Sequence, residues 1–380
     1  MANSDSVLLV ANYASNVGYA WWLMENFWVE VAEAAHSKGR RTFLAYPKID
    51  LVPPTVSNAP ITLVEQTVRP VGMCTVISGI KLIREHRVRS IYLTDWPAFS
   101  PLYAIWRLAG VRSIVMHDHT PGDRPRIGGL RGRFKAIAHR VGWFSCDSYV
   151  GVSDYIRQRL IDNWRVPPER ALVVRNGIQP FSCRSTERSR IRSELGIPTD
   201  AVMVALVSRA TYYKGWDFAV RCAAEIVRKH PRTNTRMVFC GDGNDLQAFR
   251  SLAIECGVAG LVHFLGRRDD VRSIICSADI AFHPSHGEAM SLATLEFMCA
   301  GLPVVVPDRP SVCGIIDSGL TGLTYRANDV SAAADAIVSL CFDRDLRATL
   351  GRNARAAMLE RYQLTDTNDQ FQKIVVPLLV

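Results

Sequence analysis

The chain has 380 residues, of which 48% are apolar, and its 45 basic against 36 acidic side chains give a formal net charge of +9. This length exceeds one ordinary hydrophobic core and predicts two domains, each large enough to fold unaided. No stretch approaches the roughly 20 apolar residues of a membrane helix, and the N-terminus lacks the basic region of a signal peptide. We therefore expect no membrane span, and the positive charge favours acidic partners: nucleotides, anionic lipid or nucleic acid.

Ten cysteines are scattered through the chain without a Cys-x-x-Cys pair or a regular framework. Such a distribution is typical of small buried thiols in a reducing compartment. We therefore expect free cysteines and a cytoplasmic location.

Short apolar runs alternate with helical patterns in the first half of the chain. The first run is 6–14, and the others are 42–47, 61–66, 90–95, 113–119, 148–153 and 171–177. Few of them alternate strictly between apolar and polar residues, as expected for parallel strands buried on both faces. The pattern predicts an α/β protein with a doubly wound sheet. After the first run comes Gly18, which either lets the backbone approach a phosphate or makes a simple turn.

A second set of apolar runs begins after the prolines and charged residues of 178–200. These runs are 201–208, 236–241, 262–266, 280–285, 302–307 and 321–325, with helical patterns between them. They predict a second Rossmann-like sheet. The expected domains are therefore 1–180 and 181–360, with a C-terminal helix over 361–380.

The stretch from His283 to Val305 predicts the end of a strand, a loop, a helix and another strand. Glu288 lies in the loop, and Glu296 lies one turn inside the helix that starts near Ser291. Ligands of open α/β sheets bind outside the carboxyl ends of the strands, beside helix amides that suit a phosphate. A carboxylate there accepts from sugar hydroxyls. The pattern indicates a sugar-nucleotide site, and the alternative is a pair of ordinary surface glutamates.

Polar residues that suggest a metal site occur at two places. His117 and His119 share a face where a predicted strand ends, with Asp118 between them, but a zinc site requires a third ligand and none is predicted nearby. Asp269 and Asp270 open a predicted helix, where their charge complements the helix dipole. We therefore expect no metal.

The segment from Arg124 to Arg140 is the strongest basic cluster. Arg131, Arg133 and Lys135 are interleaved with apolar residues in a pattern that predicts an amphipathic helix. The segment is either a solvated helix face or a surface that docks on an anionic membrane or an acceptor. Nucleic acid is not an expected partner, because the aromatic residues that would stack on bases mostly fall inside apolar stretches.

Several motifs resemble the retaining glycosyltransferases of family 4, the group 1 enzymes with the GT-B fold. The resemblance covers nearly the whole chain and is most specific in the second half. The motifs are the two glutamates separated by seven residues and followed by Gly-x-Pro (Glu288 and Glu296), an Arg-x4-Lys-Gly (Arg209 and Lys214), a Gly-Asp-Gly turn (Gly241), an interdomain Asn-Gly-Ile (Asn176) and a strand-end His-Thr (His119). The chain departs from the family at three positions, with Ala289 and Ser291 in place of glycines and Gln179 in place of the common Asp.

The resemblance implies two Rossmann-like domains facing a central cleft, with the final helix crossing back onto the N-terminal domain. It implies transfer of a sugar, of the hexosyl class, from a nucleotide diphosphate sugar to an acceptor, with retention of configuration and without metal or cofactor. The implied acceptor is lipid-linked or a growing cell-surface glycan, and the implied location is the cytoplasm or the inner face of the membrane.

The resemblance also assigns residues to roles. The implied catalytic residues are His119, Arg209, Lys214 and Glu288, and the implied donor-binding residues are Gly18, Arg209, Lys214, Gly241, Glu288, Ser291, Leu292 and Glu296. Two alternatives stay open: an epimerase of sugar nucleotides with the same architecture, and a non-catalytic protein that binds only the nucleotide sugar.

Overall fold

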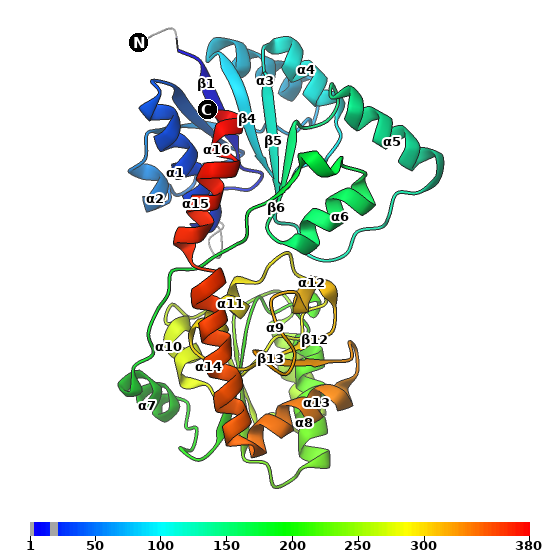
Figure 1. Cartoon of the computed structure of the whole chain (residues 1–380). Coiled ribbons are helices and arrows are strands. Elements are labelled where there is room, and N and C mark those ends of the chain that lie inside the picture. The colour runs from blue at the N-terminus through cyan, green and yellow to red at the C-terminus, as the bar shows by residue number, and fades with distance from the viewer. Residues whose placement is uncertain (1–3, 16–21) are drawn as a thin grey trace. The chain divides into compact units, whose positions relative to one another are not determined.

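The computed structural model describes residues 4–15 and 22–380, which form two compact units (Figure 1). The N-terminal unit comprises Met1–Asn176 and Thr365–Val380, and the C-terminal unit comprises Gly177–Leu364. The domain bounds expected from the sequence, 180 and 360, each lie four residues from these divisions.

The N-terminal unit is built on a parallel sheet with the strand order β3-β2-β1-β4-β5-β6-β7. Its central strands are buried on both faces, which explains why their sequences are apolar without strict alternation. The strands are β1 (Ser6–Val10), β2 (Arg41–Tyr46), β3 (Ile61–Glu65), β4 (Val88–Thr94), β5 (Ser113–Asp118), β6 (Ser148–Gly151) and β7 (Ala171–Val173).

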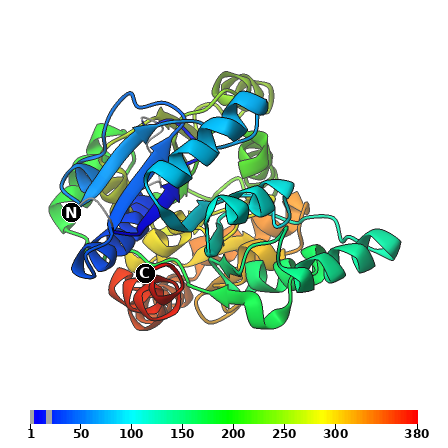
Figure 2. The same ribbon diagram turned by 90° about the horizontal axis from the view of Figure 1, so that it is seen from above.

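Helices cover both faces of this sheet (Figure 1). One face carries α1, which packs against the C-terminal helix α16, and the other carries α3 and α4. Helix α5 extends away from the rest of the unit in both views (Figures 1 and 2). The helices are α1 (Trp22–Ser37), α2 (Pro54–Ser57), α3 (Met73–Glu85), α4 (Pro101–Ala109), α5 (Gly129–Val141), α6 (Asp154–Trp164), α15 (Leu364–Ile374) and α16 (Val376–Leu379).

The end of the chain returns to the N-terminal sheet, as expected. Phe371 of α15 stacks on Phe27 of α1 with ring centroids 4.6 Å apart. The hydroxyl of Ser113 at the start of β5 donates to the carbonyl oxygen of Leu378, 2.6 Å away. The final segment is therefore a packed part of the N-terminal unit.

The C-terminal unit has a second parallel sheet, with the strand order β10-β9-β8-β11-β12-β13. The strands are β8 (Val202–Val207), β9 (Thr235–Cys240), β10 (Val262–Gly266), β11 (Ile280–Phe282), β12 (Val304–Pro307) and β13 (Gly322–Tyr325). The helices are α7 (Ser185–Glu194), α8 (Trp216–Lys229), α9 (Leu246–Glu255), α10 (Val271–Ser277), α11 (Leu292–Cys299), α12 (Pro310–Cys313), α13 (Val330–Phe342) and α14 (Arg344–Arg361). The expected α/β architecture of two Rossmann-like units is confirmed.

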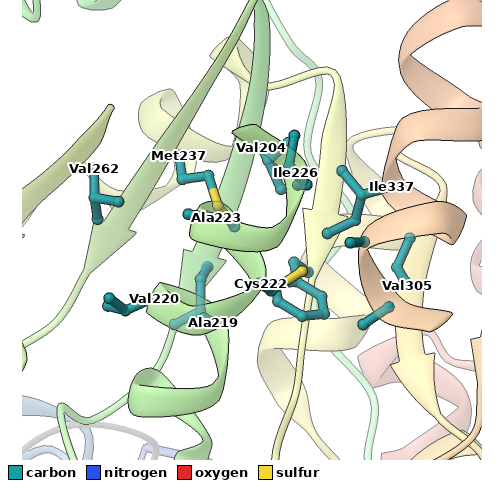
Figure 3. Packing of buried hydrophobic residues seen from close by; sticks show 14 of the residues in the cluster. Val204, Ala219, Val220, Cys222, Ala223, Ile226, Met237, Val262, Val305 and Ile337 are labelled. Atoms are coloured by element: carbon teal, nitrogen blue, oxygen red, sulfur yellow. The ribbon is translucent and has the colours of Figure 1, made fainter. Parts of the chain in front are cut away.

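The core of the C-terminal unit is centred on α8 (Figure 3). Ala219 and Ala223 are buried on this helix, and their small side chains let it approach Val204 of β8 and Met237 of β9. Ile337 of α13 is buried in the same cluster. Full burial of a side chain of this kind stabilises the fold by about 1.5–3 kcal/mol, so α8 is firmly held over the strands whose loops are described below.

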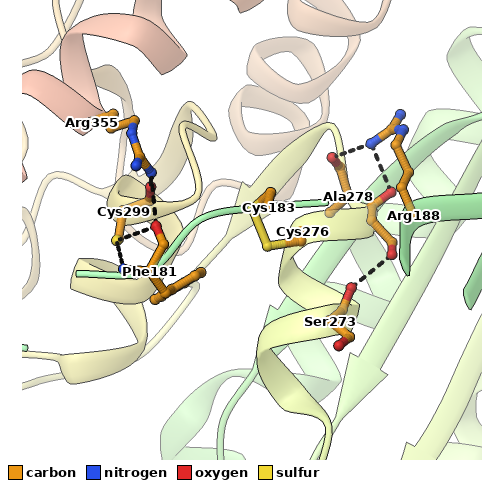
Figure 4. The surroundings of a disulfide bond; sticks show 9 residues. Phe181, Cys183, Arg188, Ser273, Cys276, Ala278, Cys299 and Arg355 are labelled. Atoms are coloured by element: carbon orange, nitrogen blue, oxygen red, sulfur yellow. Dashed lines mark hydrogen bonds between the residues drawn. A yellow bond between two sulfur atoms is a disulfide. The ribbon is translucent and has the colours of Figure 1, made fainter. Parts of the chain in front are cut away.

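One disulfide bond corrects the expectation that the cysteines are free thiols. Cys183, near the start of the C-terminal unit, is bonded to Cys276 of α10, and 93 residues separate them in the sequence (Figure 4). No spacing or motif in the sequence indicates this pair, because only the fold brings the two segments together. The other eight cysteines of the described chain are free. Within the described residues, no helix is both long enough and apolar enough to cross a bilayer.

Candidate functional site

The strand order of the C-terminal sheet reverses between β8 and β11. The chain builds outward from β8 through β9 and β10 and then returns to β11 on the other side of β8. The two strands are neighbours, with Ala281 beside Ala205. Because they are parallel, the loops 208–215 and 283–291 leave the same edge of the sheet. This reversal point is where open α/β sheets bind their ligands.

Lys214 and Glu288 form an ion pair at this edge. Lys214 Nζ lies 2.5 Å from Glu288 Oε1, and Nε2 of His283 lies 2.9 Å from the same oxygen. Burial by itself would raise the pKa of Glu288, but the charge of Lys214 and the contact with His283 outweigh it and hold the pKa well below its usual value. The structure thus brings two of the predicted site residues together and keeps the carboxylate charged at neutral pH.

Two glycines let the loops at this edge pack backbone against backbone. Gly215 follows Lys214 with a φ of +73°, and a Cβ there would overlap the carbonyl oxygen of Pro284. Gly241 follows β9 with a φ of +143°, and a Cβ there would overlap the carbonyl oxygen of Ser208. A side chain at either position would force the loops apart, which gives the predicted Gly241 a packing role here.

Arg209 lies on the same loop as Lys214 but is exposed. No side chain of the described residues forms an ion pair with its guanidinium. The two basic residues of the Arg-x4-Lys-Gly motif therefore differ in this structure. Lys214 is held by a carboxylate, and Arg209 is open to a ligand.

Glu296 lies in α11 and has a different partner from Glu288. Burial raises its pKa, and the charge of Arg272, whose Nε lies 3.9 Å from Glu296 Oε1, opposes the rise. The Arg272 guanidinium also lies over the ring of Phe181, 5.0 Å from its centroid. Arg272 comes from α10, and nothing in the sequence links it to Glu296.

His283 is the other residue at this edge to which the sequence reasoning gave no role. Its side chain is almost completely buried, and its contact with Glu288 fixes the position of that carboxylate. A histidine near the end of a predicted buried strand, five residues before a candidate glutamate, was a usable signal.

Ser291 caps helix α11. Its Oγ accepts a hydrogen bond from the amide of Thr294 at 3.2 Å, an interaction typically worth about 1 kcal/mol relative to alanine. The serine that departs from the family pattern therefore stabilises the start of this helix, while Ala289 is buried. Leu292 is the first helical residue, and amides at a helix start have no intrahelical acceptor.

His119, the predicted site residue of the N-terminal unit, follows β5. The residue is partly exposed, but its Nε2 is buried and has no hydrogen-bond partner among the described residues. Burial lowers its pKa to about 4, against the opposing charge of Asp118. His117 is completely buried, with Nδ1 2.6 Å from the hydroxyl of Tyr92, and burial lowers its pKa well below the usual value. Both imidazoles are therefore neutral at pH 7.

The remaining expectations concern Gly18 and metals. Gly18 lies outside the described residues. Within residues 4–15 and 22–380, no three His, Cys, Asp or Glu side chains gather as possible metal ligands. Asp270 directly precedes α10 and accepts from Arg268 Nε at 2.8 Å, and this interaction lowers its pKa to about 2.

Two family models match the chain. Residues 187–357 match "Glycosyl transferases group 1", and residues 24–180 match "Glycosyltransferase Family 4". The chain belongs to the group 1, family 4 glycosyltransferases. The resemblance that the motifs indicate is thereby confirmed.

Several curated relatives are named D-inositol 3-phosphate glycosyltransferase. The chain is 35% identical to the one from Corynebacterium kroppenstedtii over 245 residues, and this alignment covers 61% of this chain and 53% of the relative. It is 27% identical to an uncharacterized glycosyltransferase of Methanocaldococcus jannaschii over 72% of this chain and 71% of that one. The chain spans about half the length of the inositol phosphate transferases it matches.

Solved structures share the fold over nearly the full length. A glycosyltransferase from Rickettsia africae matches with a TM-score of 0.79 at 17% identity, covering 99% of each chain. HepE of Anabaena in complex with UDP-glucose matches with a TM-score of 0.74 at 18% identity, covering 98% of this chain and 99% of that one. At these identities the matches establish the GT-B architecture of this family member.

Proposed function

We propose that this protein transfers a sugar from a nucleotide diphosphate sugar to an acceptor, with retention of configuration and without a metal. The observation that carries the proposal is the juxtaposition of Lys214 and Glu288 at the reversal point of the C-terminal sheet, 2.5 Å apart, with the open cation Arg209 on the same loop. The UDP-glucose complex of the Anabaena structural relative supports a nucleotide-sugar donor.

The chemistry assigned to the basic pair follows from where charge grows. When the bond between sugar and diphosphate breaks, negative charge develops on a phosphate oxygen, and preorganised cations and helix-terminal amides stabilise it. Arg209 is open to this charge, and Lys214 has two further N–H donors beyond the one that contacts Glu288. The amides of Ser291 and Leu292 at the start of α11 are suited to the same anion.

The two glutamates are assigned to hydroxyl groups of the donor. Glu288 is charged and held in place by His283, which suits it to bind the hydroxyls of the donor sugar. Glu296 is assigned to the ribose hydroxyls, and His119 of the N-terminal unit to the reacting sugar. No side chain of the described site is an evident covalent nucleophile, and we assign a front-face displacement guided by the departing phosphate.

The test is turnover of purified protein against a panel of nucleotide sugars, with candidate acceptors that include lipid-linked glycans and inositol phosphate. Arg209→Ala and Lys214→Ala are each expected to lower turnover by about 100- to 1,000-fold, as removal of a preorganised charge stabiliser does. Arg232→Ala is the matched control, because Arg232 is exposed in the connection between α8 and β9, at the opposite edge of the sheet.

Four outcomes would overturn the proposal or part of it. If both variants keep turnover and only the apparent Michaelis constant rises, the pair merely holds the nucleotide. If both keep wild-type turnover and affinity, the donor does not bind at this edge. If the product is an isomerised nucleotide sugar, the protein is an epimerase, and if the sugar binds without any product, it is a non-catalytic member.

We also propose that the enzyme docks on an anionic membrane surface through α5. Leu130, Phe134, Ile137 and Val141 recur at helical spacing and are 82%, 67%, 60% and 58% exposed. The exposed Arg133 lies between them in the sequence. An apolar stripe flanked by basic residues is the pattern of a helix that lies in a membrane interface.

Sedimentation with liposomes of phosphatidylglycerol tests this docking. Phe134→Ser with Ile137→Ser is expected to abolish binding at high salt and to weaken it at low salt, because the apolar stripe supplies the part of binding that salt does not screen. Exposed Ile254 and Phe342 of the C-terminal unit, replaced by serine together, are the matched control. Equal binding of the two double variants to these liposomes would refute docking through α5. Equal binding of the wild-type protein to neutral and to phosphatidylglycerol liposomes would refute docking on an anionic surface.

A further inference from the structure

The strand order of the N-terminal sheet also reverses, between β1 and β4. Asn12 follows β1 at this point, and Asp95 directly follows β4. The side-chain amide of Asn12 donates to the carbonyl oxygens of Thr94 and Asp95, at 3.0 and 3.5 Å. Asp95 has a φ of +56°, a left-handed conformation that is uncommon for residues other than glycine. Such a conformation persists where the surroundings hold it, and it concentrates at functional sites.

Within the described residues, only one oxygen of the Asp95 carboxylate accepts a hydrogen bond. One oxygen accepts a hydrogen bond from the backbone amide of His119, with an N–O distance of 2.6 Å. Among the residues that the structure describes, no other group hydrogen-bonds to this carboxylate, and Asp95 is partly exposed. The second oxygen therefore has the capacity to accept a hydrogen bond from a ligand.

The neighbouring carboxylate of Asp118 is different. One of its oxygens accepts from both the amide and the hydroxyl of Thr120, at 3.0 and 2.5 Å. The other is paired with Arg159 at 2.8 Å, and both side chains of that ion pair are almost fully buried. Both oxygens of Asp118 are therefore occupied by contacts that hold the loop after β5. Of the two carboxylates, Asp95 is the one that can accept a further hydrogen bond.

We propose that Asp95 binds a hydroxyl group of the acceptor, a sugar or another polyol, through its second oxygen while its first oxygen positions His119. The inference rests on the transferase function proposed above. It extends that function by naming a residue that contacts the acceptor and that belongs to none of the sequence motifs.

The electrostatic environment of Asp95 agrees with a group that meets a neutral hydroxyl. Burial raises its pKa to about 7, the charge of Asp118 adds to the rise, and the amide of His119 and the charges of Arg159 and Arg124 oppose it. Among the described residues, the phenols of Tyr13 and Tyr92 also interact with the charge of Asp95. Below pH 7 the carboxyl is increasingly protonated and is a weaker acceptor for a hydroxyl. Acceptor affinity should therefore fall as the pH decreases through about 7.

Asp95→Asn is the decisive variant because asparagine keeps the oxygen that accepts from the His119 amide and tolerates the left-handed conformation. For an acceptor that the wild-type enzyme glycosylates, the Michaelis constant is expected to rise about 10- to 100-fold in the variant, because a charge-assisted hydrogen bond is lost. Affinity for the nucleotide sugar should stay unchanged, and the pH dependence near 7 should disappear. Asp5→Asn, which neutralises a carboxylate just before β1 at the opposite edge of the sheet, is the matched control.

Thermal unfolding separates this role from a structural one. A folded-state pKa raised above the unfolded value means that the charged form costs stability once the pH exceeds about 4, and this cost is complete above about 7. Asp95→Asn should therefore melt at or above the wild-type temperature at about pH 8, although it binds acceptor less well. A lower melting temperature with unchanged acceptor affinity would show that Asp95 only supports the fold, and would refute the inference.

The two proposals fail in distinguishable ways. Binding of myo-inositol and of glucose, measured by calorimetry in the presence of UDP, needs no turnover. A wild-type protein that transfers no sugar to any acceptor refutes the proposed function. Equal polyol binding by wild type and Asp95→Asn, or an equal acceptor Michaelis constant in an active enzyme, refutes the inference about Asp95 and leaves the transferase function intact.

Discussion

Separating Lys214 from Glu288 should expose a large coupling energy. The two charged atoms are 2.5 Å apart, and their side chains are only 14% and 9% exposed. At an effective dielectric constant of 20, their attraction is about 7 kcal/mol, of which desolvation of the two ions cancels a large part. Removing one partner leaves the other buried and uncompensated, which costs about 3–5 kcal/mol. Lys214→Met and Glu288→Gln should each lower the free energy of unfolding by this amount.

The double variant should lose far less than the sum of the two single losses, because it leaves no unpaired charge. Urea unfolding of wild type, both single variants and the double variant measures the coupling energy. We expect at least about 2 kcal/mol. Additivity within about 0.5 kcal/mol would show that Lys214 and Glu288 do not interact in solution.

The same cycle has a pH signature. In the wild type the pKa of Glu288 is depressed below its usual 4.5, so its stabilising contribution is present above pH 4.5 and is lost as the pH falls further. In Lys214→Met burial still raises this pKa, and only the contact with His283 still lowers it. The pKa of Glu288 should therefore be higher in the variant than in the wild type, and the variant should gain less stability as the pH rises above 4.5.

Four further predictions concern the proposed catalytic histidine, metal independence and stability. His119→Ala should lower turnover strongly with nucleotide affinity kept, and a loss confined to His117→Ala would assign the role to the neighbouring imidazole. Excess chelator should leave turnover unchanged, and activity that only manganese or magnesium restores would contradict a metal-independent reaction. Cys183→Ser removes a disulfide that joins residues 93 positions apart and should lower the free energy of unfolding by about 2–4 kcal/mol. If reductant changes the unfolding free energy of variant and wild type equally, no disulfide forms. Gly241→Ala should lower the unfolding free energy by more than about 1 kcal/mol, and wild-type stability would show that the backbone near it can shift.

The strands of both sheets were predictable because a strand that is buried on both faces has a continuous run of apolar residues in the sequence. Residues 113–119 and 280–285, for example, are apolar runs whose strands occupy the middle of their sheets. The return of the C-terminal helix was different. Phe371 packs against Phe27, but no periodic pattern reveals a partner more than 300 residues away. That feature came from the family resemblance alone.

The candidate site was predictable only as far as its chemistry is local in sequence. The carboxyl-edge rule for parallel strands places the loops of Lys214 and Glu288 together, and the structure joins them. Arg272 beside Glu296 and the Cys183–Cys276 bond depend on how α10 packs. Neither contact follows from periodicity or spacing, because each joins segments that only tertiary packing brings close.

The two sheets carry carboxylates with opposite electrostatic tuning at equivalent places. Each lies where the strand order reverses, Glu288 after β11 and Asp95 after β4. Lys214 holds the pKa of Glu288 low, whereas Asp95 has no cation within hydrogen-bonding distance among the described residues and its pKa is raised to about 7. Environments that push the pKa values of two carboxyls apart assign them different tasks. With the roles proposed above, a charged Glu288 should make donor binding insensitive to pH near neutrality, and Asp95 should make acceptor binding sensitive to it. Donor affinity that falls below pH 7 together with acceptor affinity would contradict this division.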